Sequence, residues 1–322
     1  MNSFDNAKIL ITGGAGFIGS NIVTELLKTN LRELVVFDNF ARGEKSYLTE
    51  AFKDKRCKLF LDGSDIRDTD QLDLAIEGCD YVFHTAAMWL LHCKDFPRTA
   101  FNVNIAGTFN ILEACVKHKV KKLIYSSSAS VYGDAIEVPM TEDHPFLNQN
   151  FYGATKIAGE AMCRAFYDRY GLDYVGLRYM NVYGPHQDQT AAYTGVIPIM
   201  LNKIASNEAP IINGDGTQAY DFIYVDDVAR GNILALQSLA TNSFYNIGTG
   251  VQTSIKELCE KILDIQKSNL KVKYKPYSIE DSRQMVQNRI GSTKKAIKEI
   301  DFNYNIDLES GLKKMIKWRE IN

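Results

Sequence analysis

The chain has no strong excess of either charge, no long apolar run and no closely spaced pair of cysteines. Its 322 residues carry 37 Lys plus Arg against 39 Asp plus Glu, a formal net charge of -2, so the positive field that holds nucleic acid is missing. No stretch approaches the roughly 18 apolar residues of a membrane span. Neither nucleic acid nor a membrane is therefore an expected partner.

Six cysteines are spread along the chain without a C-x-x-C pair, so neither a zinc site nor a redox dithiol is expected. We expect buried, reduced thiols and no metal site. The glycine-rich segment that begins at Gly13 leaves no room for a secretion signal ahead of it. A cytoplasmic location is the resulting expectation.

Short β-branched or aromatic runs alternate with helical or loop stretches through the first half of the chain. The expected strands are Lys8–Thr12, Glu33–Asp38, Cys57–Leu61, Tyr81–Thr85 and Lys122–Ser126. Helical spacing of apolar residues predicts a helix after the glycine run, a second over 99–118 and a third over 152–170. The alternation predicts an α/β fold, a Rossmann-like doubly wound parallel sheet with helices on both faces.

After about residue 180 the regular alternation of strands and helices gives way to shorter elements separated by turns rich in Gly, Pro and Asn. Those expected are Pro210–Ile212, Ala219–Val225 and a closing helix around Leu308–Arg319. We therefore expect a smaller C-terminal substrate-binding lobe against the sheet. The predicted division assigns 1–180 to the sheet domain, to which 219–247 returns, and 181–218 and 248–322 to the lobe.

A glycine-rich loop joins the first strand to the first helix. Gly14, Gly16 and Gly19 satisfy G-x-G-x-x-G in the strand, turn and helix context that the motif requires. Glycines let the backbone turn tightly beside a pyrophosphate, and the helix N-terminus presents N–H groups and a partial positive charge. The expected dinucleotide contacts are Gly13, Gly14, Gly16, Phe17, Ile18 and Gly19.

Asp38 ends the second strand 19 residues after Gly19, close to the ~20 expected for an acid that binds a cofactor ribose. Its carboxylate would accept from both ribose hydroxyls and repel a 2′-phosphate, which favours NAD over NADP. Arg42, four residues on, leaves the NADP alternative open. A lone glycine pattern would mark only a turn, whereas strand, loop, helix and acid together indicate a cofactor site.

Tyr152 and Lys156 begin the third predicted helix, and a spacing of four residues puts them on one face. A phenol titrates near 10, and a nearby ammonium could lower that by roughly one to three units, which would make tyrosine a usable base. Ser128 belongs to a serine-rich segment at the end of the fifth strand, the edge where such sheets bind ligands. Each pattern is weak alone, because turns and helix surfaces often contain it.

Five segments occur in the order typical of extended short-chain dehydrogenases/reductases. They are T-G-G-A-G-F-I-G, the Ser128 segment, Y-G-A-T-K, Arg178–Pro185 and Asp221–Asp227. The chain resembles the nucleotide-sugar epimerase/dehydratase branch, including UDP-glucose 4-epimerase, over nearly its whole length. The ordered set is far more specific than any one motif.

The resemblance implies roles for individual residues. Tyr152 would be the base, Lys156 would lower its pKa and hold the nicotinamide ribose, and Ser128 would position the sugar hydroxyl. The further cofactor contacts that it implies are Asn39, Asp65, Ile66, Ala86 and Asn104, of which Asn104 could instead be a polar residue on a helix flank. It also implies a homodimer paired through the helices 99–118 and 152–170.

The same resemblance narrows the reaction. The 4,6-dehydratases carry an Asp-Glu pair directly after the catalytic serine or threonine, and the decarboxylases carry a glutamate at the second place, but this chain has Ala129 and Ser130. The pattern favours an NAD-dependent nucleotide-sugar 4-epimerase that passes through a 4-keto sugar. Two alternatives stay open: a 4-dehydrogenase that releases the keto sugar, and an NAD-binding regulator or scaffold without turnover.

Two departures from the family pattern concern the substrate. The expected substrate contacts are Ser128, Asn181, Tyr220 and Arg283. Asn181 resembles a contact to the substrate's diphosphate, and Tyr220 stands where the family usually places a diphosphate-binding arginine. Arg283 or Arg289 could substitute for that arginine. The stretch Met88–Cys93 is unusually apolar. Core packing or a subunit contact explains this stretch as well as sugar selection does, and an acid/base pair of His92 and Cys93 is a further hypothesis.

Overall fold

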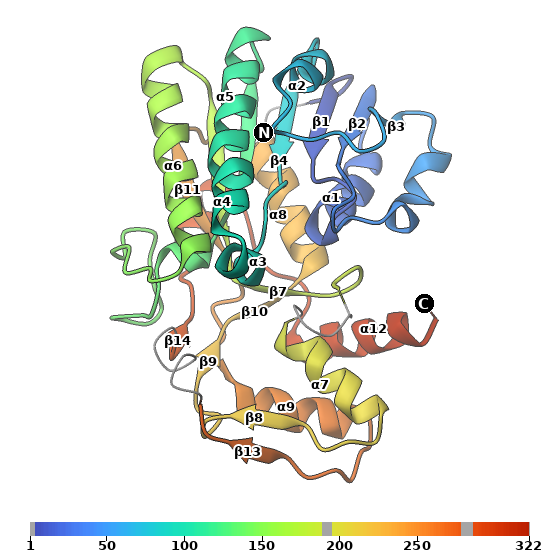
Figure 1. The fold of residues 1–322 in the computed structure, drawn as a ribbon, viewed down its shortest axis with the longest axis vertical. Helices are drawn as coiled ribbons and strands as arrows, with labels where there is room; N and C mark the ends of the chain where they lie inside the picture. Colours follow the sequence, from blue (N-terminus) through green and yellow to red (C-terminus); the bar gives the residue numbers. More distant parts are fainter. Residues whose placement is uncertain (1–3, 189–194, 278–285, 322) are drawn as a thin grey trace.

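The computed structural model describes residues 4–188, 195–277 and 286–321. Its larger part is built on a seven-stranded parallel sheet (Figure 1). The strands are β1 (Lys8–Thr12), β2 (Glu33–Phe37), β3 (Cys57–Leu59), β4 (Tyr81–His84), β5 (Lys122–Ser128), β6 (Tyr174–Tyr179) and β11 (Ser243–Ile247). Their spatial order is β11-β6-β5-β4-β1-β2-β3. The order reverses between β1 and β4, which opens a crevice at the carboxyl ends of these strands.

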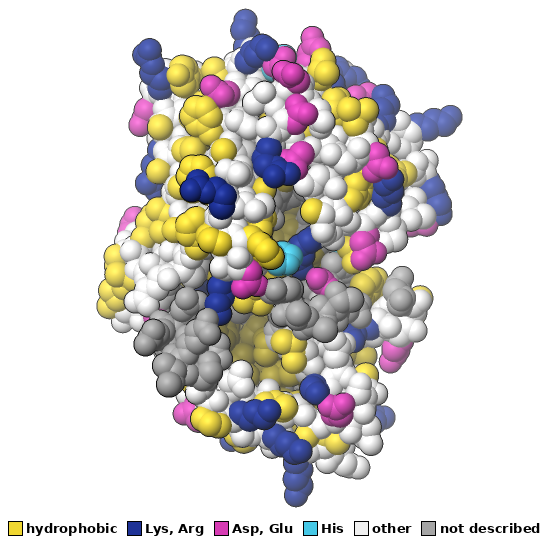
Figure 2. Space-filling view, viewed as in Figure 1, with side chains coloured by type: hydrophobic (Ala, Val, Ile, Leu, Met, Phe, Trp, Pro, Cys, Tyr) yellow, Lys and Arg dark blue, Asp and Glu magenta, His cyan; other side chains and the backbone are white. Residues whose placement is uncertain are grey.

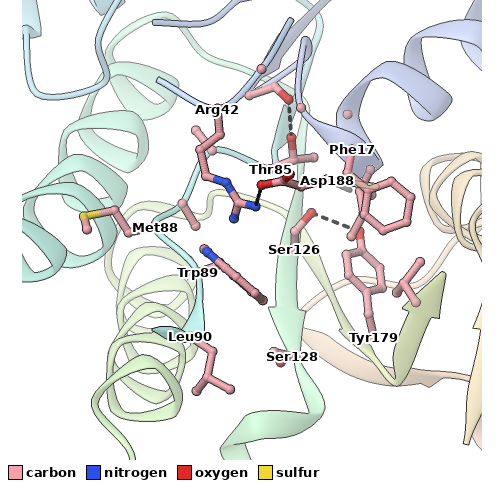
Figure 3. Close-up of a pocket in the computed structure, with 18 of the residues that line it drawn as sticks. Phe17, Arg42, Thr85, Met88, Trp89, Leu90, Ser126, Ser128, Tyr179 and Asp188 are labelled. Carbon is pink, nitrogen blue, oxygen red and sulfur yellow. Dashed lines mark hydrogen bonds and ion pairs between the residues drawn. The ribbon is translucent and has the colours of Figure 1, made fainter. Parts of the chain in front are cut away.

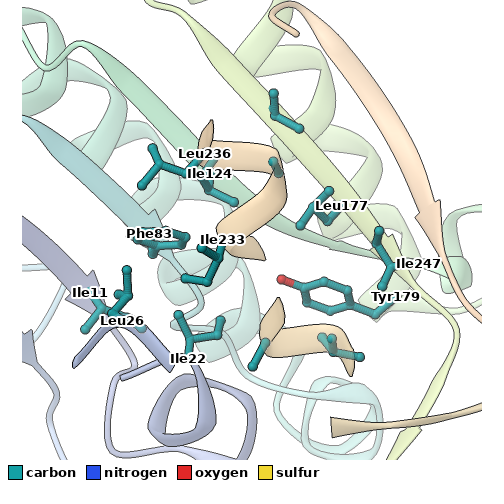
Figure 4. Close-up of a cluster of buried hydrophobic side chains, with 14 of the residues drawn as sticks. Ile11, Ile22, Leu26, Phe83, Ile124, Leu177, Tyr179, Ile233, Leu236 and Ile247 are labelled. Atoms are coloured by element: carbon teal, nitrogen blue, oxygen red, sulfur yellow. The ribbon is translucent and has the colours of Figure 1, made fainter. Parts of the chain in front are cut away.

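Helices cover both faces of this sheet (Figure 1). On one face lie α2 (Thr69–Ile76), α5 (Gly107–Lys117) and α6 (Phe151–Tyr170), and on the other lie α1 (Phe17–Leu27), α8 (Val225–Gln237) and α11 (Lys294–Ile300). Successive strand residues point to opposite faces, so Ile9 and Ile11 pack toward α1 and α8 while Leu10 packs toward α2 and α5. Figure 4 shows the first of these cores, where Ile22 and Ile233 meet beneath the sheet.

A smaller lobe lies beyond the carboxyl ends of the strands (Figure 1). It contains β8 (Ile211–Asn213), β9 (Ala219–Tyr220), β12 (Thr253–Ser254), β13 (Lys273–Lys275) and β14 (Asn288–Arg289), with helices α7 (Val196–Ala205), α9 (Ile255–Ile265) and α12 (Leu308–Ile321). A separate core joins its helices through Leu201, Leu258 and Leu312. Between this lobe and the sheet, β7 (Asn181–Tyr183) pairs with β10 (Phe222–Tyr224).

The expected α/β fold is confirmed, and two elements that were predicted as continuous are divided in the structure. The helix expected over 99–118 consists of α4 (Pro97–Ala100), a π-helical turn (Phe101–Ala106) and α5. The strand expected over Ala219–Val225 is divided between β9, β10 and the first residue of α8. Because α8 and β11 belong to the sheet layer while β9 pairs with β12 and β14, we propose that the chain returns to the larger domain from about residue 222.

Among the residues described, no helix is both long and apolar enough to cross a membrane. The same ranges contain no group of three or more His, Cys, Asp or Glu side chains arranged to hold a metal ion. All six cysteines are free and buried.

Candidate active site

A cavity of about 990 Å³ lies at the carboxyl ends of the strands, between the sheet and the smaller lobe (Figures 2 and 3). Figure 2 shows it as a hollow with hydrophobic side chains on its floor. This volume is at the upper end for small-molecule sites. Its wall includes most of the sequence-predicted residues: Gly13, Gly16, Phe17, Ile18, Gly19, Asp38, Asn39, Asp65, Ile66, Ala86, Ser128, Tyr152, Lys156 and Asn181. Gly14, Asn104 and Tyr220 are not part of the wall, and Arg283 lies outside the described residues.

The glycine loop has the geometry that close approach of a phosphate group requires. Gly13 has a φ of +69°, and a Cβ there would lie 2.7 Å from the backbone nitrogen of Ala86. A Cβ on Gly19 would lie 2.1 Å from the Gly13 carbonyl oxygen, so only glycine lets α1 pack this closely on the loop. Gly16, the first flanking residue of α1, provides no side-chain cap. The helix N-terminus therefore presents its N–H groups at the cavity, as an anion site does.

Gly14 has a different function from its neighbours in the loop. It is buried, and a Cβ there would lie 2.9 Å from the Ile11 side chain and 3.0 Å from the Val36 side chain. Its lack of a side chain lets the turn sit on the strands β1 and β2. Its predicted contact with the cofactor stays a prediction.

Asp38 is buried at the end of β2 and braces two backbone turns. Its Oδ2 accepts from the Ala15 N–H at 2.9 Å and its Oδ1 accepts from the Phe40 N–H at 2.8 Å. Burial raises the pKa of this carboxyl group, and the two N–H donors act in the opposite direction. Each oxygen keeps a further acceptor site, so the carboxylate can still accept from ribose hydroxyls.

Arg42, which left the NADP alternative open, is engaged with protein groups in this structure. Its Nη2 donates to Asp188 Oδ2 at 2.9 Å, and its guanidinium lies 4.6 Å from the centre of the Trp89 ring (Figure 3). The three side chains form a bridge across the cavity, from the loop after β2 to the loop after β7. A 2′-phosphate would have to compete with this ion pair for Arg42.

Further along the wall, Asp65 and Ile66 close one end of the cavity. Asp65 pairs with Arg67 at 2.7 Å and accepts from the Asn39 amide at 3.0 Å. The Arg67 guanidinium lowers the pKa of Asp65 to about 2. Ile66 is buried against Gly107, where a Cβ would lie 2.6 Å from its side chain. This end of the wall therefore combines a carboxylate held by Arg67 and Asn39 with an apolar side chain packed on Gly107.

Tyr152 and Lys156 stand on adjacent turns of α6 and face the cavity together. The Lys156 Nζ lies 5.7 Å from the centre of the Tyr152 ring and donates to the Ser126 carbonyl at 2.7 Å. Burial lowers the pKa of Lys156 to about 8. Burial also raises the pKa of Tyr152, while the Ser128 hydroxyl lowers it by a smaller amount. The pKa of Tyr152 is therefore raised, in the opposite direction from the shift that the sequence predicted from Lys156.

Ser128 and the two residues after it form the wall opposite α6. The Ser128 Oγ accepts from the Ser130 N–H at 3.1 Å, which caps a short helical turn (Ala129–Val131). Ala129 and Ser130 both line the cavity. The place where a dehydratase or decarboxylase needs a carboxylate is therefore at the cavity, and it carries none.

Asn104 lies behind the wall rather than on it. Its Oδ1 accepts from the Met88 N–H at 2.7 Å, and its Nδ2 donates to the Met88 carbonyl at 2.9 Å and to Thr155 Oγ1 at 3.0 Å. The amide thus ties the loop after β4 to α6, next to Tyr152 and Lys156. Since this side chain is buried and does not line the cavity, its predicted contact with the cofactor stays a prediction.

The proposed His92 and Cys93 pair is not brought together at the cavity. His92 lines the wall, but Cys93 is fully buried behind it, and its Sγ donates to the Met88 carbonyl at 3.3 Å. Burial raises the pKa of Cys93 to about 11. The thiol therefore stays protonated and packs as a core residue.

The sequence analysis missed a buried ion pair behind the catalytic wall. Glu160, one turn after Lys156 on α6, accepts from Ser127 Oγ at 2.6 Å and from Arg178 Nε and Nη2 at 2.9 and 2.8 Å. Arg178 also donates to the Tyr132 hydroxyl at 2.8 Å. Charged residues are almost never fully buried unless they are paired. Helical spacing from Lys156 could have indicated that Glu160 lies on the same face of α6, but no local pattern indicates that Arg178, on β6, is its partner.

The fold and this site define an NAD-dependent enzyme of the extended short-chain dehydrogenase/reductase class. The glycine loop, the acid after β2 and the Ser, Tyr and Lys side chains meet in one cavity at the reversal point of the sheet. More narrowly, the chain belongs to the NAD dependent epimerase/dehydratase family, whose model matches residues 9–248. NAD is accordingly its cofactor.

Relatives of known class extend over the whole chain. It is 37% identical to a putative UDP-glucose 4-epimerase of Methanocaldococcus jannaschii, covering 98% of this chain and 99% of that one. A UDP-N-acetyl-alpha-D-glucosaminuronate decarboxylase of Bacillus cytotoxicus is 32% identical, with 98% of each chain covered. The UDP-N-acetylglucosamine 4-epimerase of Methanobrevibacter ruminantium, solved with UDP-N-acetylmuramic acid, superposes with a TM-score of 0.91 at 33% identity, covering 98% of this chain and 99% of that chain.

Proposed function

We propose that the protein is an NAD-dependent nucleotide-sugar 4-epimerase. The observation that carries this proposal is the wall formed by Ser128, Tyr152 and Lys156, with Ala129 and Ser130 beside it. This wall offers the groups that oxidise and re-reduce a sugar hydroxyl, and it lacks the additional acid that dehydration or decarboxylation would need. Related 4-epimerases that act on UDP-sugars support a uridine diphosphate sugar as the substrate class.

Each side chain of this wall has a definite task in the proposed reaction. In its ionised form the Tyr152 phenolic oxygen takes the proton of the sugar hydroxyl and later returns it, while the Ser128 hydroxyl holds the reacting oxygen in place. Lys156, fixed by the Ser126 carbonyl at 2.7 Å, keeps a positive charge beside the phenol and favours its ionised form. Bound NAD supplies the acceptor for the hydride and, when oxidised, further positive charge. Asn181, on the substrate side of the cavity, would contact the diphosphate.

The alternatives differ in the product that leaves the enzyme. A 4-dehydrogenase would release a keto sugar and leave one NADH for each molecule of substrate, whereas an epimerase returns the hydride and consumes no oxidant. A scaffold would bind NAD without turnover. The carboxylate-free wall does not distinguish the first two, so product analysis is needed.

The direct test is incubation of the purified protein with UDP-glucose, UDP-galactose and UDP-N-acetylglucosamine. Proton NMR follows the configuration at C4, and absorbance follows NADH on the protein. We expect C4 epimers at equilibrium with little NADH accumulated. Keto sugar formed in stoichiometric amount with NADH would replace the epimerase by a dehydrogenase.

A Tyr152→Phe variant tests the scaffold alternative. It keeps the ring and its packing but removes the proton-transferring hydroxyl, so turnover should fall by a factor of about 100 or more while the NAD content is unchanged. If Tyr152→Phe and wild type show the same C4 epimerisation, NADH formation and NAD content, the scaffold alternative is supported.

We further propose a homodimer and a cytoplasmic location. The dimer is supported by apolar rings exposed on neighbouring helices: Phe109 is 41% exposed on α5 and Tyr170 is 58% exposed on α6. Phe109 contacts Phe166 edge-on, and Tyr170 contacts it at a tilt. Such a patch is typical of a protein contact. Sedimentation should give a dimer that Phe109→Glu weakens. The location is supported by the six free, buried cysteines, as expected under reducing conditions.

A further inference from the structure

Arg289 faces the cavity from the smaller lobe, and no described residue accepts a hydrogen bond from its side chain. It lies on β14, in register with Tyr220 of β9, and it lines the cavity whereas Tyr220 does not. The Tyr220 hydroxyl donates to the Val286 carbonyl at 2.9 Å, so it is held by the backbone of the smaller lobe. Of the two arginines that the sequence analysis named as substitutes for a cation at position 220, Arg289 lines the cavity, and Arg283 lies outside the described residues.

No described residue forms an ion pair or a side-chain hydrogen bond with Arg289, and its buried Nε has no acceptor. The carboxylate of Asp134 acts on Arg289 electrostatically without a hydrogen bond between them, and its Oδ1 accepts from the N–H groups of Gln287 and Asn288 at 2.9 and 2.8 Å. The five N–H donors of Arg289 thus have no anionic acceptor among the described residues.

An unpaired guanidinium in a half-buried wall is costly, because the group leaves water and cannot lose its proton. Burial lowers the pKa of Arg289, which marks the loss of hydration. In a binding site this cost is offset when a ligand brings a negative charge, since hydrogen bonds to an anion are about twice as strong as neutral ones.

We infer that Arg289, which lines the cavity with its buried Nε lacking an acceptor among the described residues, recognises an anionic group of the substrate. The inference rests on the proposed function. The anion is either the diphosphate of the nucleotide or a carboxylate on the sugar, since both offer the paired oxygens that a guanidinium binds in bidentate fashion.

The test measures binding to the NAD-loaded protein by isothermal titration calorimetry with uridine, UDP, UDP-glucose and UDP-glucuronate. The variants are Arg289→Gln, Arg289→Lys and the control Arg32→Gln, which removes an exposed cation at the opposite end of the sheet. We expect Arg289→Gln to weaken anion binding by about 10- to 100-fold, and Arg289→Lys to weaken it less. The affinity of Arg289→Gln for uridine should stay near that of wild type. The control Arg32→Gln should bind all four ligands as wild type does.

The four ligands separate the two sources of the anion. Loss of affinity for UDP and both UDP-sugars identifies the diphosphate, whereas loss for UDP-glucuronate alone identifies the sugar carboxylate. Equal binding of all four ligands by wild type and Arg289→Gln overturns the inference and leaves the proposed function intact. A wild-type protein that binds none of the uridine nucleotides overturns both. Thermal unfolding of each variant shows whether it has folded. If Arg289→Gln does not fold, the comparison of wild type with Arg289→Lys tests whether the guanidinium contributes to anion binding.

Discussion

Replacing Glu160 by glutamine should destabilise the protein far more than replacing its exposed partner Arg164 by glutamine. The Glu160 carboxylate is fully buried, and it accepts from Ser127 and from two nitrogens of Arg178, whose side chain is 2% exposed. Glutamine keeps the volume, so no cavity is created and the effect isolates the charge. It leaves the Arg178 guanidinium buried without its counter-charge.

The size of the effect follows from the burial of the pair. Removing one partner of a buried ion pair costs about 3–5 kcal/mol, a large part of a total stability that is typically about 5–15 kcal/mol. At about 2 °C per kcal/mol for a chain of this length, the melting temperature should fall by roughly 6–10 °C. Because Glu160 follows Lys156 by one turn and holds Ser127 beside Ser128, turnover should fall as well.

The matched control is Arg164→Gln. Arg164 also approaches Glu160, at 3.8 Å, but its side chain is 49% exposed, so its loss should cost about 0–1 kcal/mol. The assay is urea unfolding of both variants under identical conditions, with turnover measured in parallel. Equal destabilisation by the two substitutions would refute the reasoning, since burial would then make no difference to the energy of the pair.

Three further predictions concern the cofactor side of the cavity. Asp38→Asn removes the negative charge that opposes a 2′-phosphate, so the preference for NAD over NADP should fall by about tenfold or more, as measured by titration of both cofactors; an unchanged ratio would assign the preference to other groups. Lys156 has a pKa lowered to about 8 in the folded protein, so the folded state binds fewer protons than the unfolded one between about pH 8 and 10.5, and stability should rise with pH across that window. Urea unfolding of the NAD-free protein should show this rise in wild type, and a similar rise in Lys156→Met would contradict it. Trp89→Ala removes the ring that faces the Arg42 guanidinium at 4.6 Å, a contact worth about 0.5–1 kcal/mol; bound NAD should dissociate about two- to fivefold faster in a displacement assay, and Trp89→Phe should retain most of the wild-type rate.

Local patterns predicted the sheet and the cofactor end of the cavity. Strand alternation and the glycine loop depend on neighbours in sequence, so the bounds of β1 match the prediction and those of β2 differ by one residue. Helix spacing placed Tyr152 and Lys156 on one face for the same reason. These residues need only one element to bring them together.

Contacts between distant segments could not be predicted in this way. Asp221 looked like part of a functional motif, but its buried carboxylate accepts from the Thr249 and Gly250 N–H groups and so ties two loops together. The direction of the Tyr152 pKa shift depends on burial by many segments. The relation between Tyr220 and Arg289 depends on the pairing of two short strands, which no local pattern in the sequence reveals.

Arg42 joins loops on two sides of the cavity through its ion pair with Asp188 and its contact with the Trp89 ring, and the ion pair depends on the salt concentration. Arg42 and Asp188 are 34% and 33% exposed, so dissolved ions screen their attraction. Separation of this pair would release the Arg42 guanidinium from the Trp89 indole and widen the cavity there. We therefore expect bound NAD to dissociate faster as the ionic strength rises, through side chains that take no part in the chemistry.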